Sequence, residues 1–165
     1  MFRKILCPVD GTDHSTLALE RAVELAAKYG AALTICTINV AHGTGRSPRI
    51  NHWTDDQIAR ILGDAETLAK QHGHADPATV QLVAREVGPS IVQYAENGDY
   101  DCIVMGTGDK RGLSRLMLGS VAADVAGRAH CSGHGRPLTA GGRGISATPR
   151  PQRHPQRGEC APQHL

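Results

Sequence analysis

Apolar and polar positions alternate along the first 130 residues in a way that predicts strands and helices in turn. Nearly continuous apolar runs, rich in β-branched residues, predict strands covered on both faces; they occupy residues 2–9, 32–40, 79–86 and 100–106. Between and after them, apolar residues recur at helical spacing, over residues 13–29, 54–72, 88–97 and 119–129. This order favours right-handed βαβ units and an open parallel sheet with helices on both faces.

Local signals mark the ends of two of these helices. Gly30 follows the first helical stretch as a stop signal. Thr54 stands three residues before Gln57, which is the spacing of a capping box. Residues 41–53 are rich in Gly, Arg, His and Pro and show no periodicity, so they predict a connecting loop.

Polar or glycine-rich segments follow three of the predicted strands. Ligands of open parallel sheets lie beyond the carboxyl ends of the strands, which here means Asp10, Asn39, Val40 and a glycine-rich loop at 106–112. That segment continues to Gly119-Ser120, where a helix should start and present free backbone N–H groups that suit phosphate oxygens. The segment matches neither the Walker pattern nor GxGxxG.

Over residues 2–131 the chain resembles the universal stress protein family. The likeness rests on the opening KILCPVDGT, on INV at the end of the second predicted strand, and on VMGTGDKRGLSRLMLGSVAADVAGRAHC. The resemblance implies an open parallel α/β/α sandwich of the adenine nucleotide α-hydrolase-like type. It also implies the loop Gly-x2-Gly-x9-Gly-Ser/Thr of the family's ATP-binding branch. By position, Gly106, Gly119 and Ser120 would hold phosphates, Asp10 would face the nucleoside, and the Val40 backbone would meet adenine.

Asp109 departs from that pattern, because it stands where the ATP-binding branch has its second glycine. Its carboxylate would lie beside the phosphates and repel them. Gly108 could provide the close approach instead, or Mg²⁺ could bridge Asp109 to the phosphates. The expected ligand is ATP or another adenine nucleotide, and the expected role is a regulatory module in stress response with an unidentified protein partner. A family member that binds no nucleotide and a slow ATP hydrolase are the alternatives.

The same residues also have purely structural interpretations. Asp10 could cap the following helix, Ser120 could be only an N-terminal cap, and Val40 could belong to the core. His42 and His52 could border a ligand from the first long loop, although exposure to solvent is the simpler expectation. No Ser/His/Asp or Cys/His arrangement can be recognised, so we predict no catalytic residue and no enzyme activity.

Composition excludes several classes of function. Five Phe, Trp and Tyr residues leave little stacking surface, which disfavours a reader of single-stranded nucleic acid. No apolar run reaches the roughly 18 residues of a membrane span and no signal-peptide pattern opens the chain, so we expect a soluble cytoplasmic protein without membrane contact. Five cysteines without a CxxC pair indicate neither a disulfide framework nor a metal site.

The chain changes character after residue 131. Residues 1–131 predict one domain, whereas residues 132–165 form a tail rich in Pro, Gly and Arg, with five arginines against one glutamate. Its three large aliphatic residues are too few to offset ordering entropy, so we predict disorder. The resemblance implies a fifth strand, Pro-Val-x-Val-Val, at this point, through which family members pair. Its replacement by SGHGRP predicts a weakened homodimer, and a shift of reading frame would explain it.

Overall fold

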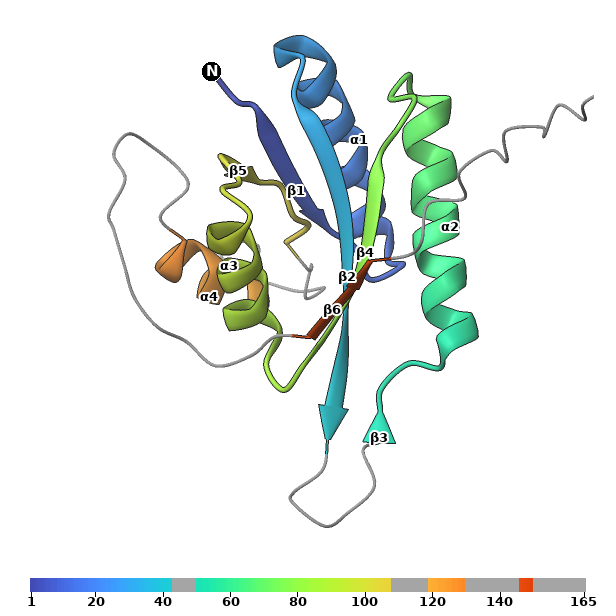
Figure 1. The fold of residues 1–165 in the computed structure, drawn as a ribbon, viewed down its shortest axis with the longest axis vertical. Helices are drawn as coiled ribbons and strands as arrows, with labels where there is room; N and C mark the ends of the chain where they lie inside the picture. The colour runs from blue at the N-terminus through green and yellow to red at the C-terminus, as the bar shows by residue number, and fades with distance from the viewer. Residues whose placement is uncertain (43–49, 108–118, 130–145, 150–165) are drawn as a thin grey trace, which may run out of the picture.

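The computed structural model describes residues 1–42, 50–107, 119–129 and 146–149. Strands and helices alternate over most of this length (Figure 1). The strands are β1 (Lys4–Pro8), β2 (Ala32–His42), β3 (Ile50–Asn51), β4 (Ala78–Ala84), β5 (Cys102–Ile103) and β6 (Ser146–Pro149). The helices are α1 (Asp13–Tyr29), α2 (Asp55–Gln71), α3 (Val87–Asn97) and α4 (Ser120–Arg128).

Four strands form a parallel sheet in the order β5-β1-β2-β4, which confirms the predicted α/β class. Antiparallel β6 extends the sheet beyond β4, and β3 pairs antiparallel with the end of β2. The chain builds outward from β1 through β2 to β4 and then returns to place β5 on the other side of β1 (Figure 1). This reversal creates a crevice beyond the carboxyl ends of β1 and β5, where ligands of such sheets bind.

Helices cover both faces of the sheet and bury two apolar cores (Figure 1). On one face, α1 and α2 pack against β1 and β2 through Leu19, Val23, Ile58 and Leu62. On the other face, α3 and α4 pack through Ile91, Val92 and Val125 against Leu6, Cys36 and Leu82. The central strands are therefore apolar on both faces, as the continuous apolar runs predicted.

The predicted ends of two helices agree closely with the structure. Helix α1 spans Asp13–Tyr29, and Gly30 ends it with a φ of 62°, a left-handed conformation that glycine adopts without steric cost. Helix α2 begins after Thr54, whose side chain accepts a hydrogen bond from the Gln57 backbone in the predicted capping box.

Two strands depart from the sequence-based expectations. Strand β2 continues to His42, and Ile50–Asn51 pairs back onto it, so the prediction of a loop from 41 to 53 is wrong at both ends. In the tail, β6 pairs with the edge of β4 over four residues of the segment for which composition predicts disorder. Backbone pairing needs no apolar side chains, which is why composition missed both strands. The rest of the tail, including the position of the expected fifth strand, lies outside the described residues.

Candidate functional site

A pocket of about 580 Å³ opens at the crevice beyond the carboxyl ends of β1 and β5. This volume lies in the range of typical small-molecule sites. The ends of β1 and β2 and the segment after β5 contribute to its lining, together with the first turns of α1, α3 and α4. Polar lining residues include Asp10, Thr12, His14, Thr37 and Ser120, and apolar ones include Ile38, Val40, Ile91 and Met105.

Asp10 occupies the loop between β1 and α1, where its carboxyl group is tied to Thr12. Its Oδ1 accepts a hydrogen bond from the Thr12 backbone N–H at 3.0 Å and from the Thr12 hydroxyl at 2.6 Å. Desolvation raises the pKa of Asp10, but hydrogen bonds from Thr12 and Ser15 outweigh it and leave the pKa below its usual range. Thr12, not Asp10, is the N-cap of α1. Asp10 therefore presents a negative charge to the pocket at neutral pH.

Gly106 brings the segment after β5 against the start of α1. A Cβ at this position would lie 2.6 Å from the His14 carbonyl oxygen and 3.0 Å from the Ser15 nitrogen. Both atoms belong to the backbone, so no side-chain movement could relieve the overlap. The absence of a side chain at Gly106 thus allows two walls of the pocket to meet.

The first turn of α4 presents backbone donors to the same pocket. Gly119 is its N-cap and provides no side-chain hydrogen bond, whereas α1 and α2 are both capped by threonine side chains. Gly119, Ser120, Val121 and Ala122 all line the pocket. The N–H groups of a first helical turn have no partner within the helix and carry partial positive charge. This end of the pocket therefore favours an anion.

Helix α4 is held in place by its contact with α3. A Cβ on Gly88 would overlap the Asp124 carboxylate, so the two helices approach closely at this point. The same carboxylate accepts a hydrogen bond from Arg128 Nε one turn later. The N-terminus of α4 is thus fixed relative to α3, whose first turn also lines the pocket.

Asn39 and Trp53 shape the opposite end of the pocket, at the end of β2. Asn39 is fully buried, and its side-chain amide donates to the Trp53 carbonyl oxygen and accepts from the Trp53 N–H, each at 3.0 Å. The rings of His52 and Trp53 meet edge to face with centroids 4.8 Å apart. The sequence indicates Asn39 as a residue near the site but not Trp53, since no local signal links residues 14 positions apart.

The structure brings five of the predicted site residues to one pocket: Asp10, Val40, Gly106, Gly119 and Ser120. The sixth, Gly108, lies outside the described residues, as does Asp109. His52, weighed as a possible border of a ligand, also lines this pocket, although its side chain is exposed.

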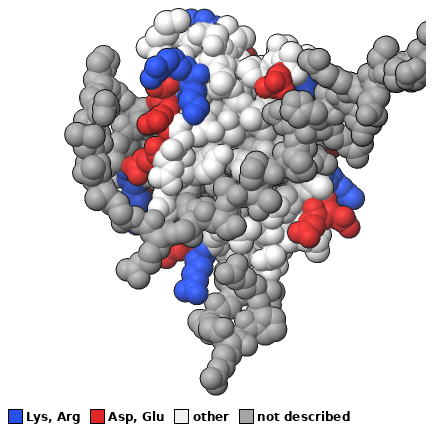
Figure 2. Space-filling view, in the orientation of Figure 1, with Lys and Arg blue, Asp and Glu red and all other residues white. Residues whose placement is uncertain are grey.

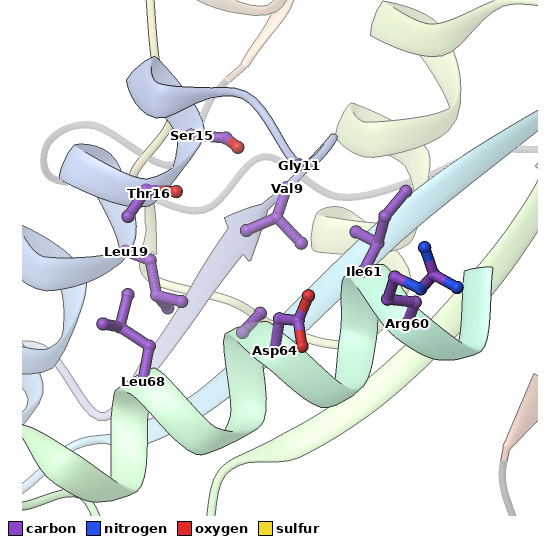
Figure 3. A pocket seen from close by; sticks show the side chains of 10 residues that line it. Val9, Gly11, Ser15, Thr16, Leu19, Arg60, Ile61, Asp64 and Leu68 are labelled. Carbon is purple, nitrogen blue, oxygen red and sulfur yellow. The ribbon is translucent and has the colours of Figure 1, made fainter. Parts of the chain in front are cut away.

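A second, smaller pocket of about 390 Å³ lies between α1 and α2 (Figure 3). It shares Val9 and Ser15 with the first pocket and is lined from α2 by Ile61 and Asp64, among others. Figure 3 shows Asp64 pointing into the space between the helices. None of the six predicted site residues lines it, so the pocket at the strand ends is the candidate site.

The described residues contain no group of three His, Cys, Asp or Glu side chains placed to hold a metal ion. Likewise, none of the helices in this part of the chain is both long and apolar enough to cross a membrane. Figure 2 shows acidic and basic side chains interspersed over the described part of one face. Charge on that face therefore does not mark a second site.

Together, the sheet order and the pocket define a doubly wound α/β protein with a pocket at its topological switch point, where ligands of such sheets bind. The model of the universal stress protein family matches residues 1–132, and the chain belongs to that family. A curated universal stress protein of Methanocaldococcus jannaschii is 33% identical over 138 residues, which cover 79% of each chain.

Solved structures of the family share this fold. A universal stress protein in complex with cAMP has a TM-score of 0.63 and 26% sequence identity, covering 78% of this chain and 92% of that one. The universal stress protein from Archaeoglobus fulgidus in complex with dAMP has a TM-score of 0.55 and 26% identity, covering 79% of this chain and 93% of that one. Both relatives were thus solved with adenine nucleotides.

Proposed function

We propose that this protein binds ATP or another adenine nucleotide in the pocket at the strand ends and acts as a non-catalytic regulatory module in the cytoplasm. The observation that carries the proposal is the first turn of α4, whose N-cap makes no side-chain hydrogen bond and which faces a pocket that Asp10 and Val40 also line. The relatives solved with cAMP and dAMP support an adenine nucleotide as the ligand.

The two ends of the pocket suit different parts of the expected nucleotide. The N–H groups at Ser120 and Val121 suit phosphate oxygens. Asp10 carries a negative charge, so it suits hydroxyl or amino donors of the nucleoside and would repel a phosphate placed beside it. Phosphates at α4 and the nucleoside toward Asp10 and Val40 therefore satisfy both ends. In this arrangement Gly108 would supply the close approach to the phosphates in the segment that carries Asp109, or Mg²⁺ would bridge Asp109 to them.

Calorimetry with ATP and Mg²⁺ tests the proposal, with Gly119→Val as the disruptive variant. Gly119 has a φ of −54°, which valine adopts without backbone strain, and the added methyl groups would stand beside the donors of α4 and obstruct an anion there. We expect at least a tenfold loss of affinity, about 1.4 kcal/mol. Gly127→Val is the matched control, because Gly127 lies at the other end of the same helix with nothing within 4 Å of an added Cβ.

Two further measurements separate the alternatives. Asp109→Gly removes a charge beside the proposed phosphates, and we expect it to tighten ATP binding. Absence of binding at millimolar ATP in the parent would instead favour a family member that works through protein partners alone. A phosphate-release assay addresses hydrolysis, and turnover of about 1 s⁻¹ or faster would contradict a non-catalytic role.

A further inference from the structure

We propose that Trp53 and His52 form the wall of the pocket that recognises the base of the nucleotide, and that the buried Asn39 side chain positions this wall. The inference rests on the proposed function and extends it to Trp53, which sequence analysis did not include, and to specific roles for His52 and Asn39. Both aromatic residues line the pocket beside Val40, at the end of β2. Because β2 and β5 lie on opposite sides of β1, this wall faces the nucleoside end of the pocket and not the start of α4.

Asn39 fixes the wall through two hydrogen bonds to the backbone of one residue. Its amide both donates to and accepts from Trp53, at 3.0 Å in each case, and none of its surface is exposed. Movement of Trp53 would leave a buried amide without partners, which costs far more than an exposed bond. A third bond, from the His52 N–H to the Val40 carbonyl oxygen at 2.9 Å, fastens the same segment to β2.

The two rings offer an aromatic surface that is already in position before a ligand arrives. Trp53 is partly buried against the core beneath α1 and α2, and His52 meets it edge to face. Aromatic side chains bind bases by stacking on the π face that every base has, and a fixed ring loses little entropy on binding. A phosphate or sugar lacks such a face, so this wall distinguishes ligands with a base from ligands without one.

Trp53 is the one tryptophan in the sequence, so its fluorescence reports on this wall. The experiment compares ATP with inorganic triphosphate, which has the same number of phosphates and no nucleoside. We expect ATP to change the emission of Trp53 in the wild-type protein. We expect triphosphate to bind at the start of α4, as calorimetry would record, while the emission stays unchanged.

Two variants and one control complete the test. Asn39→Leu should weaken ATP binding about tenfold and leave triphosphate binding within about twofold, since stacking of one base is worth about that factor or more. His52→Ala, at an exposed side chain, should weaken ATP binding by a smaller factor without burdening the fold. Thr34→Val is the control. Thr34 lies on β2, as Asn39 does, but outside the pocket, and the change removes a part-buried hydrogen bond that the Tyr100 hydroxyl donates to Thr34.

The outcomes separate this inference from the proposed function. Binding of neither ligand to the wild-type protein overturns both. ATP binding without a change in Trp53 emission, or with equal ATP affinity in Asn39→Leu and Thr34→Val, overturns the role of the wall and leaves nucleotide binding intact. If circular dichroism shows that Asn39→Leu does not fold, His52→Ala and the wild-type emission decide, and unchanged values in both overturn the inference.

Discussion

Gly106→Ala tests whether the segment after β5 must approach α1 as closely as the structure shows. The added Cβ would lie 2.6 Å from the carbonyl oxygen and 2.7 Å from the carbonyl carbon of His14. Ordinary carbon contacts lie at roughly 3.5–4.0 Å, so one of the two backbones must move by about 1 Å. Overpacking of this kind typically costs about 1–3 kcal/mol.

An opposing contribution comes from the unfolded chain. Gly106 does not have a positive φ, so alanine can adopt its backbone conformation, and it reduces the unfolded-state entropy by about 0.4–1 kcal/mol. The middle of each range, about 2 kcal/mol of overpacking against about 0.7 kcal/mol of unfolded-state entropy, leaves a net destabilisation of about 1.3 kcal/mol. For a chain of this size each kcal/mol lowers Tm by roughly 2–4 °C, so thermal unfolding should show a decrease of about 3–5 °C.

Gly63→Ala is the matched control, since Gly63 lies inside α2 with nothing within 4 Å of an added Cβ. Alanine is a better helix former than glycine by up to about 1 kcal/mol, so this variant should raise Tm. ATP binding should weaken in Gly106→Ala and not in Gly63→Ala, because Gly106 lines the pocket and Gly63 does not. An unchanged or higher Tm in Gly106→Ala would refute the close approach, whatever its effect on binding.

Three further predictions concern parts of the chain outside the pocket. The backbone N–H groups of Arg3 and Lys4 donate to Asp101 and lower its folded-state pKa. The resulting stabilisation is present above the unfolded value of about 3.9 and is lost as pH falls through the folded pKa, so Asp101→Asn should cost about 1 kcal/mol in urea titrations at pH 7 and progressively less as pH falls below that value. Burial raises the pKa of the Cys7 thiol to about 12 and that of Cys36 as well, so mass spectrometry should find neither alkylated at pH 8 without denaturant. Removal of residues 146–165 uncovers the edge of β4 that β6 occupies and should increase self-association in light scattering. The same average mass per particle, in chain units, for the truncated and the full chain would contradict this.

The sequence predicts the part of the fold that depends on local signals. Helix α1 could be predicted to the residue because its apolar spacing ends at a glycine that adopts a left-handed conformation. The start of helix α2 could also be predicted from the sequence, since the capping box involves residues only three apart. Along the sheet, continuous apolar runs identified the four parallel strands, although β5 is much shorter than its run, with two residues in the ladder. Hydrophobicity sets burial, but hydrogen-bond geometry decides where a ladder ends.

Features that rest on contacts between distant residues could not be predicted. The two hydrogen bonds between Asn39 and Trp53 join a strand to a loop. An Asn within an apolar run does not by itself indicate which distant residue it bonds. The close approach of Gly106 to His14 joins segments 92 positions apart. Strand β3 likewise depends on the return of the chain to β2, which composition does not indicate. The proposed phosphate end of the pocket could thus be predicted from a motif, whereas its aromatic wall required the folded chain.

The tail is connected to that wall through the sheet itself. Ser146 of β6 pairs with Val83 of β4, and Val83 in turn pairs with Asn39 of β2. The strand that composition assigned to a disordered tail therefore supports the register of β4 at the position where Asn39 holds Trp53. Ladder hydrogen bonds transmit a shift in one strand to its neighbours, because each backbone group has one preferred partner. Loss of β6 should consequently loosen the base-facing wall before it affects the start of α4, which packs against α3 on the opposite face of the sheet.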